Sequence, residues 1–293
     1  MKPPAFAYHA PTSLEAALDL LAELGADAKV LAGGQSLVPM LNMRLVAPAA
    51  LVDIRHLGDL DRVEVAAEVV RVGARVTHAR LERDGEAARA LPLLREALGL
   101  VAHPVIRNRG TSVGSVVHAD PAGELPAVVA LLDATLELTS TAGVRTVRGA
   151  EAFVGPLESA LRPGELATAV EFPALPPNTG TAIEELARRH GDYALAGVAV
   201  RVTLDPDRRV DTASAAFFGV GGMPEAIALD GPLRGQASDA LDPADALGAA
   251  REALDPDDDI HATASYRRHL AGVLLERALR RAAAAAARQE ALA

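Results

Sequence analysis

Two short segments of the chain combine glycines with hydroxyl side chains in a way that could hold an anion. The first, Ala32–Ser36, reads AGGQS and lies between a short apolar segment and an expected helix. Adjacent glycines let a backbone approach a ligand closely. Ser36 suits a helix N-cap, where free N–H groups favour a pyrophosphate. A tight strand-to-helix turn without a ligand explains the same spacing equally well, so both interpretations stay open.

The second segment, Arg107–Ser115, reads RNRGTSVGS. Its small residues, hydroxyls and guanidinium groups are compatible with phosphate binding, and its alternative interpretation is an ordinary polar loop. The dinucleotide fingerprint GxGxxG and the Walker A motif are both absent from the sequence. Any phosphate site here therefore differs from those two motifs.

Gly110-x-Ser112-x-Gly114 matches the nucleophile elbow of hydrolases, which needs a buried strand before the serine and a helix directly after it. Pro104 and the arginines before the serine disfavour a buried strand, and Pro121 interrupts any long helix after it. We expect the match to be accidental. A serine hydrolase using Ser112 is kept as the alternative from a different class.

Polar residues also gather in two other places. His118, Asp120 and Glu124 lie within seven residues, but no further histidine has metal-ligand spacing. We therefore favour hydrogen bonds to a ribose, or helix capping, over a metal site. Tyr193 follows the polar sequence RRHGD in a chain without tryptophan. It is either a rim residue or a ring face for a planar cofactor.

The elements that must position these residues follow from periodicity and punctuation. Thr12–Leu24 predicts a helix that opens with a capping box and stops at Gly25. The other elements expected before residue 177 are strands at 29–31, 51–54 and 69–73, helices at 88–98 and 127–132, and a hairpin over 136–148.

A composition break at Pro173–Asn178 predicts a domain boundary, because paired prolines continue neither a helix nor a central strand. Beyond it the pattern predicts strands at 182–187, 194–204 and 210–220, then helices at 244–254 and from 264 to about 291. The alanine tract 282–287, flanked by arginines, belongs to the last helix. The order of elements indicates the α+β class.

Composition narrows the function further. The chain has 293 residues, a net charge of −10 and no cysteine. The acidity argues against nucleic-acid or membrane-surface binding. The missing cysteines exclude disulfides, thiolate nucleophiles and cysteine-held iron–sulfur clusters on this chain. No segment predicts a signal peptide or a membrane span, so we expect a cytoplasmic protein.

The motifs, taken in order, resemble the FAD-binding medium subunit of molybdenum hydroxylases, the group of aerobic carbon monoxide dehydrogenase and xanthine dehydrogenase. The resemblance covers nearly the whole chain. It is carried by the start at Pro3–Leu14, KVLAGGQSL at 29–37, IRNRGT at 106–111, HADPAGELP at 118–126 and RHGDYA at 189–194.

The resemblance implies a two-part FAD domain of the vanillyl-alcohol-oxidase (PCMH) type at 1–177, with subdomains at about 1–57 and 58–177. A smaller C-terminal domain of antiparallel sheet and helices follows at 178–293. The cofactor-binding residues it implies are Lys29, Leu31, Ala32, Gly33, Gly34, Gln35, Ser36, Leu37, Ala102, Thr111, Gly114, Ser115, Asp120, Glu124, Leu161 and Tyr193. It implies no catalytic side chain and no metal on this chain.

Within that resemblance, the two glycine segments hold the FAD pyrophosphate by backbone N–H groups, and Tyr193 lies beside the isoalloxazine. Asp120 and Glu124 match positions near the pyrophosphate and ribose. The family usually has glycine where this chain has Val113. A β-branched residue disfavours positive φ, so we expect either an extended backbone at Val113 or a register shift of one residue.

The function implied by the resemblance is electron relay. A large subunit with a molybdenum cofactor oxidises the substrate, a small [2Fe-2S] subunit passes electrons to the FAD of this chain, and an external acceptor takes them. The absence of cysteine fits clusters carried on another chain. The resemblance implies a heterotrimer that dimerises. A stand-alone FAD-dependent reductase or oxidase is the related alternative.

Overall fold

The computed structural model describes residues 2–290, and its first part is a small parallel sheet with one covering helix. Its strands are β1 (Ala7–His9), β2 (Ala28–Leu31) and β3 (Ala50–Asp53), in the order β1-β3-β2. Its helices are α1 (Leu14–Leu24), η1 (Gly25–Asp27) and α2 (Leu37–Met43). The predicted helix starts one residue later than the capping box suggested, because the Ser13 hydroxyl accepts from the Ala16 N–H.

The second part is an antiparallel sheet in the order β4-β5-β10-β6-β7. Its strands are β4 (Val63–Val65), β5 (Val69–Gly73), β6 (Thr135–Ser140), β7 (Gly143–Arg148) and β10 (Leu166–Pro173), with a separate small pair β8 (Phe153–Gly155) and β9 (Glu158–Ser159). The predicted hairpin is confirmed as β6 and β7. β10 was not predicted, although it joins β5 to β6 in the centre of the sheet.

Helices between β5 and β6 carry most of the polar motifs. They are α3 (His78–Arg83), α4 (Gly85–Ala90), α5 (Pro92–Leu100), α6 (Pro104–Arg107), α7 (Ser112–His118) and α8 (Glu124–Leu132), and the short 3-10 turns of this part are η2 (Gly58–Leu60) and η3 (Gly149–Glu151). The single helix predicted over 88–98 is wrong. Pro92 cannot donate a backbone hydrogen bond, so one helix ends before Leu91 and another starts at Pro92.

The third part is an antiparallel sheet of β11 (Thr179–Ala187), β12 (Ala194–Leu204), β13 (Val210–Phe218) and β14 (Glu225–Ala228). Side chains on successive residues of a strand point to opposite faces. Val198 and Phe217 accordingly join the core under the C-terminal helices, whereas Ala199 and Phe218 join the core of the preceding parts. The sheet is therefore buried on both faces.

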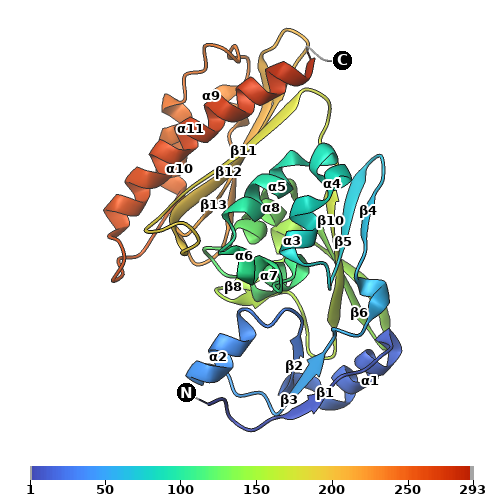
Figure 1. The fold of residues 1–293 in the computed structure, drawn as a ribbon. Helices are drawn as coiled ribbons and strands as arrows, with labels where there is room; N and C mark the ends of the chain where they lie inside the picture. The colour runs from blue at the N-terminus through green and yellow to red at the C-terminus, as the bar shows by residue number, and fades with distance from the viewer. Residues whose placement is uncertain (1, 291–293) are drawn as a thin grey trace.

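The C-terminal helices cover the outer face of this sheet (Figure 1). They are α9 (Asp230–Leu233), α10 (Ala244–Ala253) and α11 (Ala264–Glu290); the expected end near Ala291 lies outside the described residues. α11 lies directly on β11, where a methyl group added to Gly180 would overlap the carbonyl oxygen of Ala282. Small residues on both elements thus set the close approach of helix and sheet.

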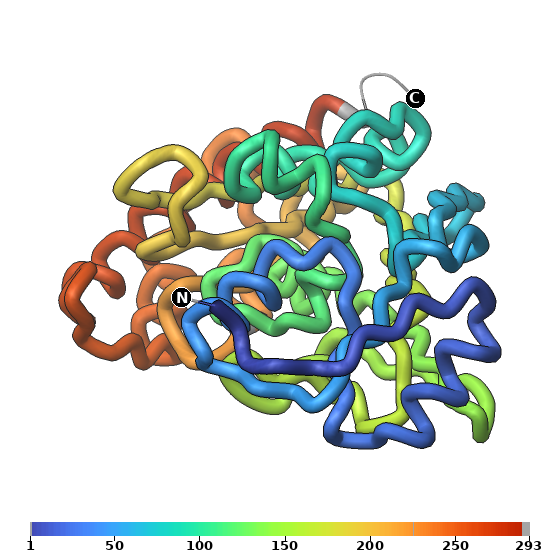
Figure 2. The backbone as a smooth tube through the Cα atoms, turned by 60° about the horizontal axis from the view of Figure 1, so that its bottom comes forward, coloured from blue at the N-terminus to red at the C-terminus, as the bar shows by residue number. Residues whose placement is uncertain are grey.

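The three parts follow one another along the molecule (Figure 1). The small parallel sheet lies at one end and α10 and α11 lie at the other. Seen from the end with the small sheet, the blue N-terminal segments come forward and the green segments of 100–135 lie behind them (Figure 2). The predicted boundary at 177/178 falls in the connection between β10 and β11. Within residues 2–290, no helix combines the length and apolarity of a membrane span.

Candidate functional site

A cavity of about 1260 Å³ opens where the three parts meet. Its wall includes the 32–37 turn, the start of α7, the 120–124 segment, the 161–167 segment, and residues at the near ends of β12 and β13. Pockets for drug-sized ligands are usually about 300–1,000 Å³. The cavity is therefore large enough for an elongated cofactor that contacts every part of the chain.

The first glycine turn lies directly against the second polar segment. A methyl group added to Gly33 would overlap the carbonyl oxygen of Arg109 and lie 2.7 Å from the Cα atom of Gly110. Gly34 has φ +74°, which side chains with a Cβ rarely adopt. Both glycines are thus required by the backbone, one for close approach and one for its dihedral angle.

Several residues of this turn line the cavity and have backbone donors without partners among the described residues. No acceptor in residues 2–290 bonds the N–H groups of Gly33, Gly34, Gln35 or Ser36. Ser36 precedes α2 with helical dihedrals and makes no side-chain cap, so the predicted capping role of its hydroxyl is wrong. The run of free N–H groups is a cradle for an anion.

The second segment is a short loop at 108–111 followed by the start of α7. The Thr111 hydroxyl accepts from the Gly114 N–H at 3.2 Å, and the Thr111 carbonyl accepts from Ser115 at 3.0 Å. Ser112 donates its N–H to Val76 at 3.0 Å. This leaves the Val113 N–H without an acceptor among the described residues.

Val113 lies in the first turn of α7 and is not among the residues with positive φ. The expected extended backbone at this position is wrong, because Val113 is helical, whereas the alternative of a register shift stays a prediction. A helical backbone accommodates a β-branched residue at negative φ without the strain that motivated them. The departure from the family's glycine is therefore compatible with the observed turn.

The hydrolase alternative fails on access and on the missing acid. The Ser112 hydroxyl lies 3.3 Å from Nδ1 of His78, but Ser112 is 2% exposed. Burial and the nearby Arg107 charge lower the pKa of His78 to about 4. No carboxylate contacts His78 in the part of the chain that the structure describes. A short helix follows the serine and ends at His118, before Pro121 as expected, and the buried hydroxyl cannot reach a substrate.

Acidic residues line the middle of the cavity. Asp120 accepts from the Ala122 N–H at 2.9 Å and thereby shapes the turn before α8. Burial, together with the negative charges of Glu185 and Asp120, raises the pKa of Glu124 to about 8. Burial also raises the pKa of Glu185, on β11, to about 7. Glu124 is therefore mostly protonated at neutral pH and can donate a hydrogen bond.

Near Tyr193, the cavity is bordered by two closely packed segments and by an exposed ring. Ala102 has φ +42°, and a methyl group added to Gly191 would lie 3.1 Å from the Ala102 carbonyl carbon. Tyr193, two residues further on, is 72% exposed although it lines the cavity. An exposed aromatic ring at a cavity mouth provides a flat face for a planar ligand.

The structure brings together nearly all residues that the sequence singled out. The residues that line the cavity are Lys29, Ala32, Gly33, Gly34, Gln35, Ser36, Leu37, Ala102, Thr111, Gly114, Ser115, Asp120, Glu124, Leu161 and Tyr193. Leu31 does not line it. Its side chain instead packs beneath Gly34, and its carbonyl accepts from Ile54.

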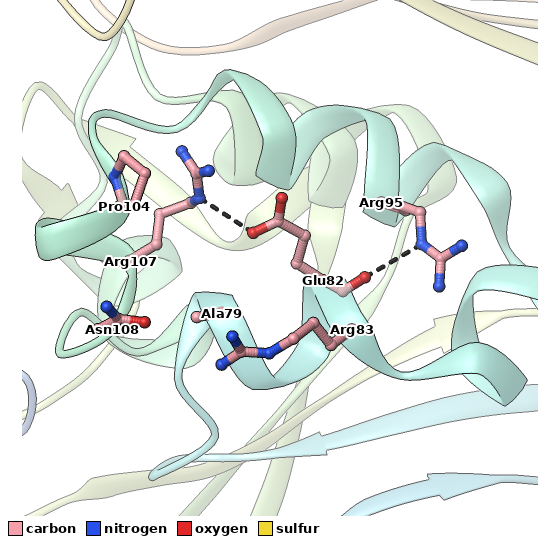
Figure 3. A pocket seen from close by; sticks show the side chains of 7 residues that line it. All are labelled: Ala79, Glu82, Arg83, Arg95, Pro104, Arg107 and Asn108. Carbon is pink, nitrogen blue, oxygen red and sulfur yellow. Dashed lines mark hydrogen bonds and ion pairs between the residues drawn. The ribbon is translucent and has the colours of Figure 1, made fainter.

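A second cavity, of about 550 Å³, lies on the outer side of α3 and α6 (Figure 3). Arg83, Arg95 and Arg107 surround the side chain of Glu82 there. Arg95 donates to the carbonyl oxygens of Glu82 and Asp84, at 3.0 and 3.3 Å. Most hydrogen bonds of these polar groups are therefore made to other groups of the protein around this cavity.

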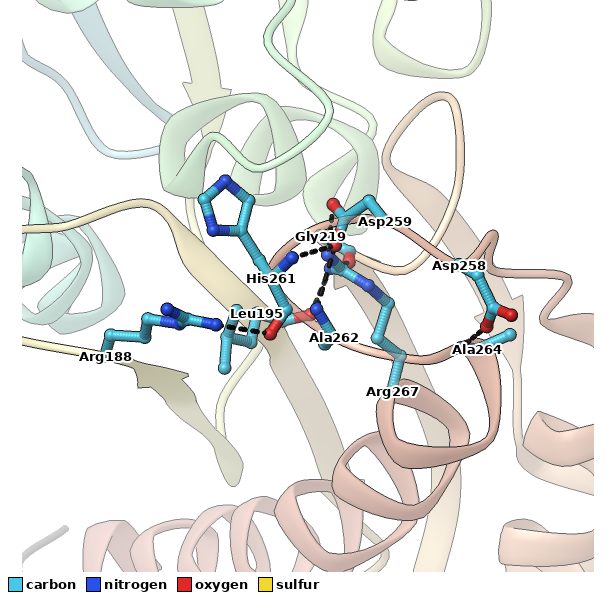
Figure 4. A network of polar contacts seen from close by, with 9 residues as sticks. All are labelled: Arg188, Leu195, Gly219, Asp258, Asp259, His261, Ala262, Ala264 and Arg267. Atoms are coloured by element: carbon cyan, nitrogen blue, oxygen red, sulfur yellow. Dashed lines mark hydrogen bonds and ion pairs between the residues drawn. The ribbon is translucent and has the colours of Figure 1, made fainter.

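Part of the main cavity's wall comes from residues that were not predicted. Gly219–Gly222 follow β13, and Arg267 lies near the start of α11. Arg267 donates to the carbonyl oxygens of Leu195 and Gly219, at 2.7 and 2.6 Å, and to Asp259 at 2.7 Å (Figure 4). The glycines at the end of the strand predicted over 210–220 were a signal that could have been used, whereas nothing in the sequence singled out Arg267.

Two family models together match most of the chain. Residues 4–175 match "FAD binding domain in molybdopterin dehydrogenase", and residues 181–282 match "CO dehydrogenase flavoprotein C-terminal domain". The chain belongs to the FAD subunits of the molybdenum hydroxylase family. Its cofactor is accordingly FAD, and it is an oxidoreductase subunit. The expected α+β architecture is confirmed.

Relatives of this FAD subunit match over nearly their full lengths. The carbon monoxide dehydrogenase medium chain of Afipia carboxidovorans is 42% identical, covering 98% of this chain and 99% of its own. The 6-hydroxypseudooxynicotine dehydrogenase complex subunit alpha of Paenarthrobacter nicotinovorans is 41% identical, with 96% of each chain covered. A chain of quinoline 2-oxidoreductase from Pseudomonas putida 86 superposes with a TM-score of 0.90 at 38% identity, covering 98% of this chain and 99% of its own.

Proposed function

We propose that the free N–H groups of residues 33–36, with that of Val113, bind the pyrophosphate of FAD. The observation that carries this proposal is the close backbone contact between Gly33 and Arg109, which brings the two glycine segments to one wall of the cavity. Four successive unpartnered donors suit a dianion. Thr111, Gly114 and Ser115 contribute by building the turn of α7 that presents the Val113 N–H.

The remaining cavity residues have roles that follow from their places. Tyr193 and the turn at Ala102 border the planar ring system, and Asp120 and Glu124 lie toward the ribose and pyrophosphate. A protonated Glu124 donates a hydrogen bond without adding negative charge beside a phosphate. Lys29, Leu37 and Leu161 complete the wall.

Bound FAD supplies the redox chemistry of this subunit. The chain's own residues hold the cofactor, orient it and shield it from water, and we assign none of them a catalytic proton transfer. Electron relay within a molybdenum hydroxylase is the function of the family to which the chain belongs. The geometry derived above thus serves binding rather than bond making by side chains.

We further propose that this chain works in a heterotrimer, itself dimeric, with a molybdenum-cofactor large subunit and a [2Fe-2S] small subunit. The relatives are named as medium chains or as subunits of complexes. Their names point to different substrates, among them carbon monoxide and caffeine, at similar identity to this chain. Substrate choice therefore belongs to the large subunit. The expected cytoplasmic location stays a prediction.

FAD titration of the full-length chain tests the proposed site. The wild type is expected to bind one FAD, whereas Gly33→Ala should weaken binding at least about tenfold, since the added methyl group forces the two segments apart. Gly99→Ala is the matched control, because a methyl group there meets nothing within 4 Å. Equal FAD affinity of Gly33→Ala and the wild type would contradict the assignment of this turn.

Purification from the native host separates the complex from a stand-alone flavoprotein. Two further chains, together with molybdenum and iron, are expected to co-elute with this one. A chain that elutes alone with its FAD would instead support the stand-alone reductase or oxidase.

A further inference from the structure

Arg107 belongs to the segment that the sequence marked for phosphate binding, yet its side chain contacts other groups. Nη1 donates to the carbonyl oxygens of Val101 and Ala102, at 3.0 and 3.1 Å. Nε donates to Glu82 at 3.0 Å, and the Arg107 side chain is only 11% exposed. Glu82 thus fixes the orientation of the guanidinium, and the guanidinium in turn binds the two carbonyl oxygens.

Those two carbonyls come directly after α5, where a helix leaves acceptors without intrahelical donors. An arginine near such an end commonly satisfies them. Here the turn also contains Ala102 at φ +42°, a left-handed dihedral that is unfavourable for alanine. Hydrogen bonds from outside the turn are therefore needed to stabilise its conformation.

The same turn forms part of the cavity wall next to the loop of Tyr193. Val101 and Ala102 both line the cavity. Gly191, two residues before Tyr193, lies so close to this turn that an added methyl group would be 2.7 Å from Cε1 of His103. A relaxed turn would consequently press on the Tyr193 loop and change the space beside it.

The neighbouring arginines do not share this role. In the smaller cavity the Arg83 side chain makes no hydrogen bond or ion pair within residues 2–290. Arg95 donates to the carbonyls of Glu82, in α3, and of Asp84, at the end of α3 (Figure 3). Glu82 lines the same cavity as these arginines, and its carboxylate accepts a hydrogen bond from Arg107. Arg107 thus lines the smaller cavity and also bonds the turn that forms part of the wall of the main cavity.

We propose that Arg107 is a positioning residue of the FAD site, which fixes the Val101–Ala102 turn beside the flavin ring. The proposal rests on the proposed site and deepens it. Arg107 acts through the two carbonyls, and Glu82 fixes the orientation of its guanidinium. A lysine at this position keeps the charge and can still donate to the carbonyls, whereas a methionine keeps only the bulk.

The test measures FAD affinity and the visible circular dichroism of bound FAD in full-length variants. Arg107→Met should weaken FAD binding about tenfold, the value of roughly one hydrogen bond to a charged group, and change the dichroism. Arg107→Lys should stay within about threefold of the wild type. Adding Ala102→Gly to Arg107→Met should restore most of the affinity, because glycine adopts positive φ without strain.

Arg83→Met is the matched control, since it removes an arginine from the same outer cavity without touching the turn. Arg107→Met with wild-type affinity and dichroism would overturn the proposal while the wild type still binds FAD. The same holds if the loss in Arg107→Met is not relieved by Ala102→Gly. A wild type that binds no FAD at all would instead refute the proposed site, so the two failures are distinguishable.

Discussion

At the scale of single residues, the site depends on groups whose chemistry is changed by their surroundings. Glu124 is the clearest example, because burial and two nearby carboxylates favour its neutral form. Gly33 and Gly34 are required for different reasons, the first by a neighbouring backbone and the second by its dihedral angle. A residue's type alone therefore does not reveal its role here.

The raised pKa of Glu124 predicts a pH dependence of stability. Between its ordinary value of 4.5 and about 8, the folded chain retains a proton that the unfolded chain releases. The free energy of unfolding should thus fall as pH rises through this window, by up to about 1.4 kcal/mol per pH unit. Glu124→Gln should remove this part of the fall, as measured by urea unfolding of the FAD-free chain at several pH values.

Glu86→Gln is a suitable comparison for that experiment, because Glu86 is an exposed carboxylate on α4. It reports the effect of removing a negative charge from an acidic chain without touching the cavity. A pH slope that is the same in Glu124→Gln and the wild type would show that Glu124 is ionised in the folded chain.

Several of these residues were predictable and others were not. The glycine turn and the polar segments at 111–124 were found because short motifs carry them. Arg267 was missed because a lone arginine leaves no local pattern. β10 was missed although its apolar run between Gly164 and Pro173 is a local strand signal. The error at Val113 came from assigning a dihedral angle by analogy, whereas the helix start at Thr111 determines it.

At the scale of elements, two seven-residue helices present the backbone groups of the site. α2 starts without a side-chain cap, whereas the hydroxyl of Thr111 caps α7. Thr77 caps α3 in the same way, by accepting from Arg80 at 3.3 Å, but it does not line the cavity. The two threonines therefore have similar local functions and different relations to the ligand.

Replacing either threonine by alanine should cost about 1 kcal/mol of stability, the usual value of an N-cap. Thr111→Ala should in addition weaken FAD binding several-fold, because it loosens the turn that presents the Val113 N–H. Thr111→Ser should restore both properties. Urea unfolding and FAD titration of the three variants measure the two effects separately; equal FAD affinity of Thr77→Ala and Thr111→Ala would count against a role for α7 in binding.

At the scale of the whole molecule, the cavity exists because the C-terminal domain docks on the FAD domain. Gly219 donates its N–H to the carbonyl of Pro121 at 2.8 Å, and Phe218 is buried in the core of the preceding parts. Arg267 ties the ends of β12 and β13 to the 259–262 loop. The end of β13 thus takes part both in docking, through Gly219 and Phe218, and in the cavity wall that Arg267 supports.

Arg267→Met should lower the free energy of unfolding by about 2–4 kcal/mol, since two partly buried carbonyls lose a charged donor. It should also weaken FAD binding, because the displaced ends of β12 and β13 belong to the cavity wall. The adjacent Arg268, which pairs with the exposed Asp255, provides the control. Arg268→Met should cost less than about 1 kcal/mol. Similar decreases in the free energy of unfolding and in FAD affinity in both variants would contradict a particular role of Arg267 in the cavity wall.

The contact between Pro121 and Gly219 has a consequence for how such subunits diverge. A chimera that joins the first 177 residues of this chain to the C-terminal domain of a relative combines two parts that together form one cavity. The cavity forms correctly only if the residues of the two source proteins are compatible at the contact between Pro121 and Gly219, even when each domain folds by itself. Exchange of whole domains among these proteins is therefore constrained by a handful of positions far from the junction.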